Sequence, residues 1–154
     1  MNVWYVNSIL GTFRLEEEDN AICGLALCPD GVPELEPLPR KVCETPLLQE
    51  AEEQLNEYFA GARREFDLPL APKGTPFQKA VWAEMCRIPY GETRTYGQLA
   101  AAVGKPKASR AVGGACHCNP IAILQPCHRV VGSTGRLTGY AYGVEMKQYL
   151  LELE

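Results

Sequence analysis

Residues 95–116 have the sequence TYGQLAAAVGKPKASRAVGGAC, which contains the signals of two short helices. Thr95 and Gln98 have the spacing of a capping box, in which each side chain satisfies the backbone at the other residue. The helix that they begin is expected to run to Gly104, and Pro106 is expected to open a second helix that runs to about Cys116. Two short helices joined by a tight Gly-Lys-Pro turn form a helix-turn-helix.

The second of these helices carries few long side chains. Apart from Arg110, most of its residues are small, namely Ala108, Ser109, Ala111, Gly113, Gly114 and Ala115. Helices that read bases in the major groove usually carry long polar side chains. A smooth helix suits close approach in the minor groove, with one projecting side chain free to enter the base stack. A small-residue helix packed tightly in a protein core is the alternative interpretation.

A thiol with possible activating partners follows this segment. Residues 121–124 form an apolar run, and the sequence Pro126-Cys127-His128-Arg129 follows it after Gln125. A thiol becomes a strong nucleophile when a base or a positive charge favours the thiolate, and His128 and Arg129 supply such partners. Neighbouring side chains of an extended chain point apart, so we expect a bridging water between Cys127 and His128. The glycine-rich loop 132–143 is expected to form one wall of a pocket, before a last helix from about Val144.

The N-terminal half has the pattern of a small sheet followed by a helix. Residues 3–6, 12–15 and 21–27 are β-like runs, and the third ends at the strong turn signal Pro29-Asp30-Gly31. Thr45 is expected to cap a helix that Gly61 ends. Residues 63–75 read as a boundary. The sequence therefore predicts two domains, residues 1–72 and 73–154.

The formal net charge of −4 over 154 residues argues at first against nucleic acid as a partner. The charge is unevenly divided, however: residues 1–72 have a net charge of −9 and residues 73–154 a net charge of +5. A basic half can hold a phosphate backbone while an acidic half faces away. Two solvated surfaces that happen to differ are the alternative interpretation.

Other classes of protein are disfavoured by composition. The longest apolar run, residues 21–28, is far shorter than the roughly 18 residues of a membrane span, so no membrane partner is expected. The chain does not begin with the basic stretch and following apolar stretch of a secretory signal peptide, so export is not expected. Seven cysteines without secretory context indicate reduced thiols in a cytosol. Without an exposed heptad pattern, a monomer is expected.

The motifs of the second half resemble those of the O6-alkylguanine-DNA alkyltransferases, also called methylated-DNA–protein-cysteine methyltransferases. The matching motifs are GTPFQKAVW (74–82), IPYGET (88–93), TYGQLA (95–100), KPKASRAVGG (105–114), NP (119–120), PCHRVV (126–131) and GY (139–140). They cover essentially all of the second half in the family's order and spacing, whereas the first half matches only loosely. The resemblance implies an α+β chain. A small N-terminal antiparallel sheet with a helix, ribonuclease-H-like, precedes a mostly helical, winged-helix-like helix-turn-helix domain that carries the active-site cysteine.

The resemblance also implies an activity. Such a protein flips O6-alkylguanine, and O4-alkylthymine, out of double-stranded DNA and transfers the alkyl group irreversibly to its own Cys127. It would bind the minor groove largely independently of sequence, be consumed after one turnover, and need no cofactor and no metal. A cytoplasmic location is expected, associated with the nucleoid in a prokaryote, or nuclear in a eukaryote.

Roles for individual residues are carried over from the matching motifs. Catalytic residues would be Cys127, His128, Glu154, Asn119 and Tyr96; substrate-binding residues would be Tyr96, Val130, Gly139, Tyr140, Ala141 and Lys147; DNA-binding residues would be Thr95, Tyr96, Arg110, Ala111, Gly113 and Ser133. Arg110 would fill the vacated stack, and His128 would act as a base through a water with Glu154 orienting it. Asn119 would be a hinge residue that ties the recognition helix to the active-site strand.

Two departures from the family pattern and three alternatives remain. Gln125 stands where the family usually has an aliphatic residue, which raises a question about the polarity of the pocket. Residues 116–118, Cys-His-Cys, are adjacent and cannot all reach one ion without strain, and the first half has no histidine for a structural zinc. The alternatives are a non-catalytic sensor of alkylguanine, a cytosolic Cys-His thiol hydrolase, and a helix-turn-helix regulator.

Overall fold

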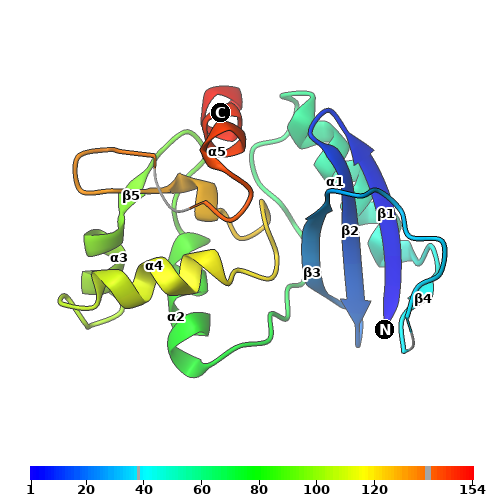
Figure 1. Ribbon diagram of the computed structural model, residues 1–154, viewed down its shortest axis with the longest axis horizontal. Helices are drawn as coiled ribbons and strands as arrows, with labels where there is room; N and C mark the ends of the chain where they lie inside the picture. The colour runs from blue at the N-terminus through cyan, green and yellow to red at the C-terminus, as the bar shows by residue number, and fades with distance from the viewer. Residues whose placement is uncertain (38, 138–139) are drawn as a thin grey trace. The chain divides into compact units, whose positions relative to one another are not determined.

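The computed structural model describes residues 1–37, 39–137 and 140–154. The chain consists of two compact units, Met1–Pro72 and Lys73–Glu154. The first unit combines a sheet with a helix, and the second is mostly helical (Figure 1). The α+β class expected from the sequence is confirmed.

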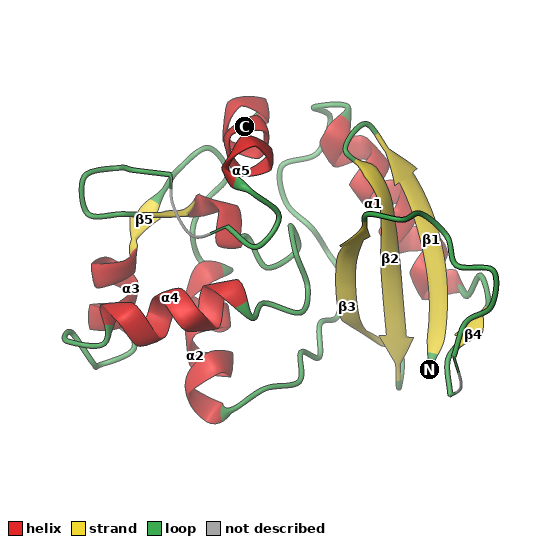
Figure 2. Ribbon diagram, viewed as in Figure 1, coloured by secondary structure: helices red, strands yellow, loops and turns green. Residues whose placement is uncertain are grey.

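The first unit is built on a sheet with the strand order β3-β2-β1-β4. Its strands are β1 (Asn2–Ser8), β2 (Gly11–Glu18), β3 (Ala21–Cys28) and β4 (Lys41–Val42). The three long strands pair in antiparallel fashion, as expected. The short edge strand β4 pairs in parallel with β1, which the local sequence pattern did not predict (Figure 2).

Helix α1 (Pro46–Phe59) packs against the three long strands of this sheet. Thr45 is its N-cap, as predicted, and its side chain accepts a hydrogen bond from the Leu48 amide at 3.2 Å. Leu48, Ala51, Leu55 and Tyr58 are buried along one face of the helix. Helical spacing of apolar residues therefore supplies the cover of the sheet.

The second unit contains the elements that carry the motif residues. They are α2 (Pro76–Met85), β5 (Arg94–Thr95), α3 (Tyr96–Ala102), α4 (Ser109–His117), the 3₁₀ turn η1 (Cys127–Arg129), β6 (Val130–Val131) and α5 (Val144–Leu153). Strands β5 and β6 pair in parallel, and α3 packs on α4. The predicted helix-turn-helix is present.

The boundaries inside the helix-turn-helix differ from the expected ones. The capping box at Thr95 and Gln98 forms, with hydrogen bonds of 2.8 and 3.0 Å. Helix α3 ends at Ala102, because Gly104 has a φ of +80° and closes the helix with a Schellman pattern, in which the Lys105 amide donates to the Ala100 carbonyl at 2.9 Å. Pro106 lies in the following turn, so the prediction that it opens the second helix was wrong.

Helix α4 has one buried face and one exposed face. Val112, Ala115 and Cys116 are buried, and the Trp82 indole of α2 donates to the Ala115 carbonyl at 2.8 Å. Its exposed residues are Ser109, Arg110, Ala111, Gly114 and His117. The helix is therefore only half in the core, and its small exposed residues form a smooth surface.

No helix in the described parts of the chain combines the length and the apolar character needed to cross a lipid bilayer.

Candidate active site

The turn η1 places three consecutive functional side chains in the interior. Cys127 and Arg129 are each 7% exposed, and His128 is fully buried. The Val130 amide caps the turn by donating to the Cys127 carbonyl. Cys127 and His128 thus lie on a 3₁₀ turn and not on the extended chain that the sequence had indicated. No direct hydrogen bond joins their side chains among the described residues.

Asn119 connects the end of α4 to the thiol. Its Nδ2 donates to Cys127 Sγ at 3.2 Å and to the Gln125 carbonyl at 2.8 Å. Its Oδ1 accepts from the Ile121 amide at 3.1 Å and from Gln125 Nε2 at 2.8 Å. The loop that these bonds hold contains Ile123 with a φ of +70°, which is strained backbone for a β-branched residue.

The Glu154 carboxylate binds the side chains of His128 and Arg129, the two other residues of the turn. His128 Nε2 lies 2.7 Å from Glu154 Oε2, while Arg129 donates from Nε to Oε1 at 2.8 Å and from Nη2 to Oε2 at 3.0 Å. Arg129 Nη1 also donates to the Ile88 carbonyl at 2.8 Å, and the Gly91 amide donates to Glu154 Oε1 at 3.1 Å. The Glu154 side chain is fully buried. A carboxylate at His128 Nε2 leaves Nδ1 as the acceptor nitrogen of the neutral ring.

Burial keeps the thiol and the imidazole uncharged at neutral pH. It raises the pKa of Cys127, against the lowering effects of the Asn119 hydrogen bond and the Lys147 charge. It lowers the pKa of His128, against the raising effect of Glu154. The positive charge acting on the thiol comes from Lys147, whereas Arg129 is paired with Glu154. The expectation that Arg129 would supply this charge was wrong.

Lys147, Tyr96 and Tyr140 surround the same interior region. Lys147 of α5 is 1% exposed, and its Nζ lies 5.8 Å from the centroid of the Tyr96 ring. Burial lowers the pKa of Lys147 and raises that of Tyr140, and both groups interact electrostatically with Cys127. The Tyr140 hydroxyl and His128 Nδ1 are buried without a hydrogen-bond partner among the described residues. Polar atoms beside the thiol are therefore available to a substrate or a water.

The expected DNA contacts lie on or near the surface. Arg110, Ala111 and Ser133 are exposed, and Thr95, Tyr96 and Gly113 are half-buried. A Cβ added at Gly113 would lie 4.0 Å from the Tyr96 ring, so α3 and α4 approach each other there.

The remaining expected substrate contacts divide into two buried residues and one exposed residue. Val130 and Tyr140 are buried, whereas Ala141 is exposed. Gly139 lies outside the described residues.

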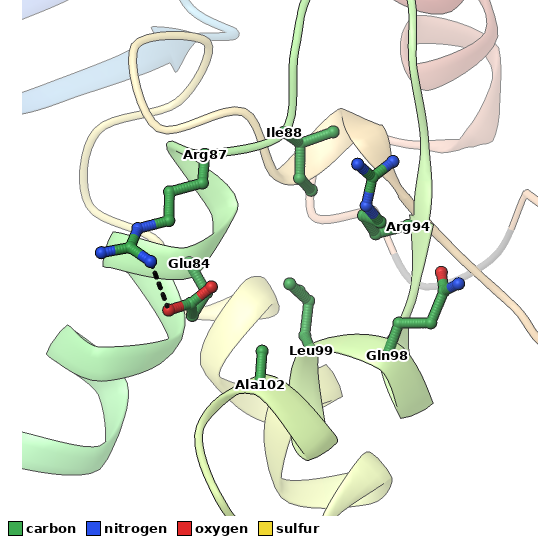
Figure 3. Close-up of a pocket in the computed structure, with 7 residues that line it drawn as sticks. All are labelled: Glu84, Arg87, Ile88, Arg94, Gln98, Leu99 and Ala102. Atoms are coloured by element: carbon green, nitrogen blue, oxygen red, sulfur yellow. Dashed lines mark ion pairs between the residues drawn. The ribbon is translucent and has the colours of Figure 1, made fainter.

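A separate pocket of about 310 Å³ lies between the end of α2, β5 and α3. Ile88 approaches from one side and Leu99 and Ala102 from the other, as Figure 3 shows. Glu84 and Arg87 form an ion pair of 3.6 Å at its rim. Neither Cys127 nor any other thiol or hydroxyl group lines the pocket, so the buried thiol is the stronger candidate for chemistry.

The two cysteines and the histidine at the end of α4 differ in their exposure to solvent. Cys116 is buried with its Sγ 3.6 Å from Met85 Sδ, while His117 and Cys118 are exposed. No group of three or more histidine, cysteine, aspartate or glutamate side chains is arranged to hold a metal ion within the described residues.

The sequence analysis did not predict the pairing of Arg129 with Glu154 or the hydrogen bond from Gln125 to Asn119. The local signal for the ion pair was a basic residue next to His128. The local signal for the hydrogen bond was Gln125, a polar residue at the end of an apolar run.

Comparison with protein families accounts for almost the whole chain. Residues 3–72 match the family model described as the ribonuclease-like domain of 6-O-methylguanine DNA methyltransferase. Residues 76–154 match the model of the DNA binding domain of the same family. The ribonuclease-like description agrees with the expectation for the first half.

Individual relatives and a solved structure agree with this assignment. The chain is 60% identical over 106 residues to a methylated-DNA–protein-cysteine methyltransferase of Methanosarcina barkeri, covering 69% of this chain and 67% of that protein. It is 58% identical over 112 residues to the constitutive enzyme of that name from Bacillus subtilis, covering 72% and 68%. The crystal structure of Mycobacterium tuberculosis OGT in complex with DNA matches with a TM-score of 0.90 and 40% identity, over 99% of this chain and 92% of that one. The chain belongs to the 6-O-methylguanine DNA methyltransferase family.

Proposed function

We propose that this protein repairs DNA by moving the alkyl group of O6-alkylguanine onto its own Cys127 in a single turnover. The observation that carries the proposal is a buried thiol hydrogen-bonded to Asn119 at 3.2 Å and followed in the same turn by a histidine paired with Glu154 at 2.7 Å. This arrangement can activate a thiol and hold the resulting positive charge on an imidazole. O4-alkylthymine presents a similar alkyl carbon and is a second substrate on this proposal.

The exposed face of α4 is the DNA-binding surface on this proposal. Its small residues allow the helix to approach the minor groove, where little sequence is read. A base buried in the duplex must leave the stack before its alkyl carbon can reach an interior sulfur, at a cost of a few kcal/mol. Arg110 is the long exposed side chain of this helix that fills the vacated space, with Ala111, Gly113 and Ser133 beside the backbone of the DNA.

The transfer is a substitution at the alkyl carbon. Cys127 Sγ forms the new carbon–sulfur bond while the bond between that carbon and guanine O6 breaks. The thiol proton passes through a water to His128 Nδ1, and Glu154 stabilises the imidazolium through Nε2. The thioether does not revert to a thiol, so the protein is consumed.

Residues around the thiol hold the extruded base. The carbonyls of Cys127 and Val130 accept from the exocyclic amine of guanine, and the Ala141 amide donates to the oxygen that bears the alkyl group. Tyr96 gives its phenolic proton to the base so that guanine leaves as a neutral molecule, and the phenolate is reprotonated through water by the imidazolium of His128. Lys147 lies against the Tyr96 ring. Tyr140 completes the substrate pocket among the described residues.

The second unit, residues 73–154, is the DNA-binding alkyltransferase domain on this proposal, and the first, residues 1–72, is a separate sheet-and-helix domain.

We place the protein in the cytoplasm, where reduced thiols persist and DNA is accessible in a prokaryote.

Intact mass spectrometry tests the transfer. After incubation with excess duplex that contains O6-methylguanine, the protein is expected to gain the mass of one methylene group and no more with time. Peptide mapping is expected to locate the methyl group on Cys127, with the six other cysteines as internal controls. An unchanged mass with the duplex still methylated but bound would instead indicate a non-catalytic sensor.

Arg110→Ala is expected to slow repair of the duplex by about tenfold or more, since the cost of base extrusion is no longer offset. The reaction with free O6-benzylguanine needs no extrusion and is expected to keep its rate. Arg87→Ala is the matched control, because Arg87 is also exposed but lines the separate pocket. Second-order rate constants for both substrates measure the effect, and equal losses would contradict the role of Arg110.

A further inference from the structure

Gln125 is a buried amide in an otherwise apolar run. It is 3% exposed and follows the buried residues Ile121, Ala122, Ile123 and Leu124. An amide in such surroundings costs free energy unless it is hydrogen-bonded. Its Nε2 donates to Asn119 Oδ1 at 2.8 Å, so the side chain is directed at the residue that contacts the reactive sulfur.

Both the oxygen and the nitrogen of the Asn119 side-chain amide form two hydrogen bonds each. Two donors, the Ile121 amide and Gln125 Nε2, bind its oxygen, and its nitrogen donates to the Gln125 carbonyl and to Cys127 Sγ. Hydrogen bonds in a chain polarise one another, and donors at an amide oxygen make the N–H groups of that amide stronger donors. Gln125 thus stands at the start of a chain of hydrogen bonds that ends at the thiol.

We propose that Gln125 is a positioning residue for the reactive sulfur: its side chain holds and polarises the Asn119 amide that donates to Cys127 Sγ. The inference rests on the function proposed above for Cys127. It also gives Gln125 a role that does not concern the polarity of the substrate pocket, because its amide is bonded to Asn119 and needs no contact with the alkyl group.

The size of the effect is limited by the second donor. The Ile121 amide still binds Asn119 Oδ1 when the side chain of Gln125 is removed, so the orientation of Asn119 is retained. Loss of one neutral hydrogen bond corresponds to a decrease of about threefold to tenfold in the rate at which Cys127 reacts at neutral pH. Among the described residues, the titratable groups that act on or adjoin the sulfur include Lys147, Cys116, Tyr140 and the neighbouring His128. Gln125→Leu changes none of these groups.

The test measures alkylation of Cys127 by iodoacetamide from pH 6 to 10, followed by peptide mass spectrometry so that the exposed Cys86 and Cys118 do not interfere. Gln125→Leu removes the donor at similar volume and is expected to slow the reaction and move the midpoint of its pH profile upward. Gln125→Glu places an acceptor against Asn119 Oδ1 and is expected to give the larger shift. Gln125→Met serves as the second apolar variant if Gln125→Leu does not fold.

A double-mutant cycle separates positioning from packing. In an Asn119→Ala background, Gln125→Leu is expected to have no further effect on the Cys127 rate. An unchanged rate and midpoint in the single variant, or an equal loss with and without Asn119, would overturn the inference. Because iodoacetamide involves no DNA, a shift in this assay supports the inference even where the mass experiment shows no transfer from alkylated duplex.

Discussion

Replacing Cys127 by serine is expected to abolish alkyl transfer while leaving the affinity for alkylated duplex within about twofold of the original protein. A serine hydroxyl is a far weaker nucleophile than a thiol at neutral pH, and His128 cannot compensate for that difference. The hydroxyl still accepts the hydrogen bond that Asn119 Nδ2 donates to the sulfur. The DNA-binding face of α4 and the exposed Arg110 are untouched by the change.

Two measurements check this expectation. Intact mass after incubation with O6-methylguanine duplex reports transfer, and fluorescence anisotropy with the same duplex reports binding. Cys118→Ser is the matched control, because Cys118 is an exposed cysteine of the same unit and is expected to leave transfer unchanged. Loss of binding together with transfer in Cys127→Ser would show that the thiol is needed for the structure of the pocket.

Replacing Glu154 by alanine is expected to reduce both stability and transfer. Its carboxylate pairs with Arg129 at 2.8 Å and with His128 at 2.7 Å, and its side chain is fully buried. Removing one partner of a buried ion pair leaves the other charge uncompensated, at a cost of about 3–5 kcal/mol in the free energy of unfolding. The imidazolium that forms during transfer also loses its stabilising partner, which predicts a loss of about 10²-fold or more in rate.

A second substitution separates these two effects. Glu154→Ala combined with Arg129→Met removes the uncompensated charge, so much of the lost stability is expected to return. Transfer is not expected to return, because His128 still lacks its carboxylate. Glu152→Ala on the same helix is the control, since Glu152 is exposed and its carboxylate accepts a hydrogen bond from Gln148 on the same helix. Urea unfolding and the rate with O6-benzylguanine give the two readouts, and joint recovery in the double variant would assign Glu154 a purely structural role.

The sequence alone predicted the parts of this protein that depend on neighbouring residues. The capping box at Thr95, the N-cap at Thr45 and the helix-turn-helix each rest on a few residues whose backbone and side chains interact locally. Such signals depend little on distant parts of the chain, because the interacting groups are only a few residues apart. The Cys127 motif differs from these signals, because a Cys-His pair alone is weak evidence for a nucleophile and the prediction depended on the resemblance of the surrounding motifs to a family.

Local signals failed where a contact spans a long stretch of chain. Strand β4 depends on pairing with β1, some forty residues earlier in the sequence, and two residues carry too little pattern to reveal it. The end of α3 and the start of α4 were misplaced for a different, local reason, because Gly104 closes one helix and Pro106 occupies the turn between the two helices.

Only the tertiary structure decided which charge faces which group in the interior. Arg129 and Glu154 are 25 residues apart, and their pairing removes Arg129 from the thiol and leaves Lys147 as the positive charge that acts on Cys127. Gln125 is an unexplained polar residue in the sequence, and it gains a role only because the loop closes on Asn119. The order of residues determines which groups are available, whereas burial and long-range packing determine their partners, because electrostatic and hydrogen-bond energies depend on distance and local dielectric.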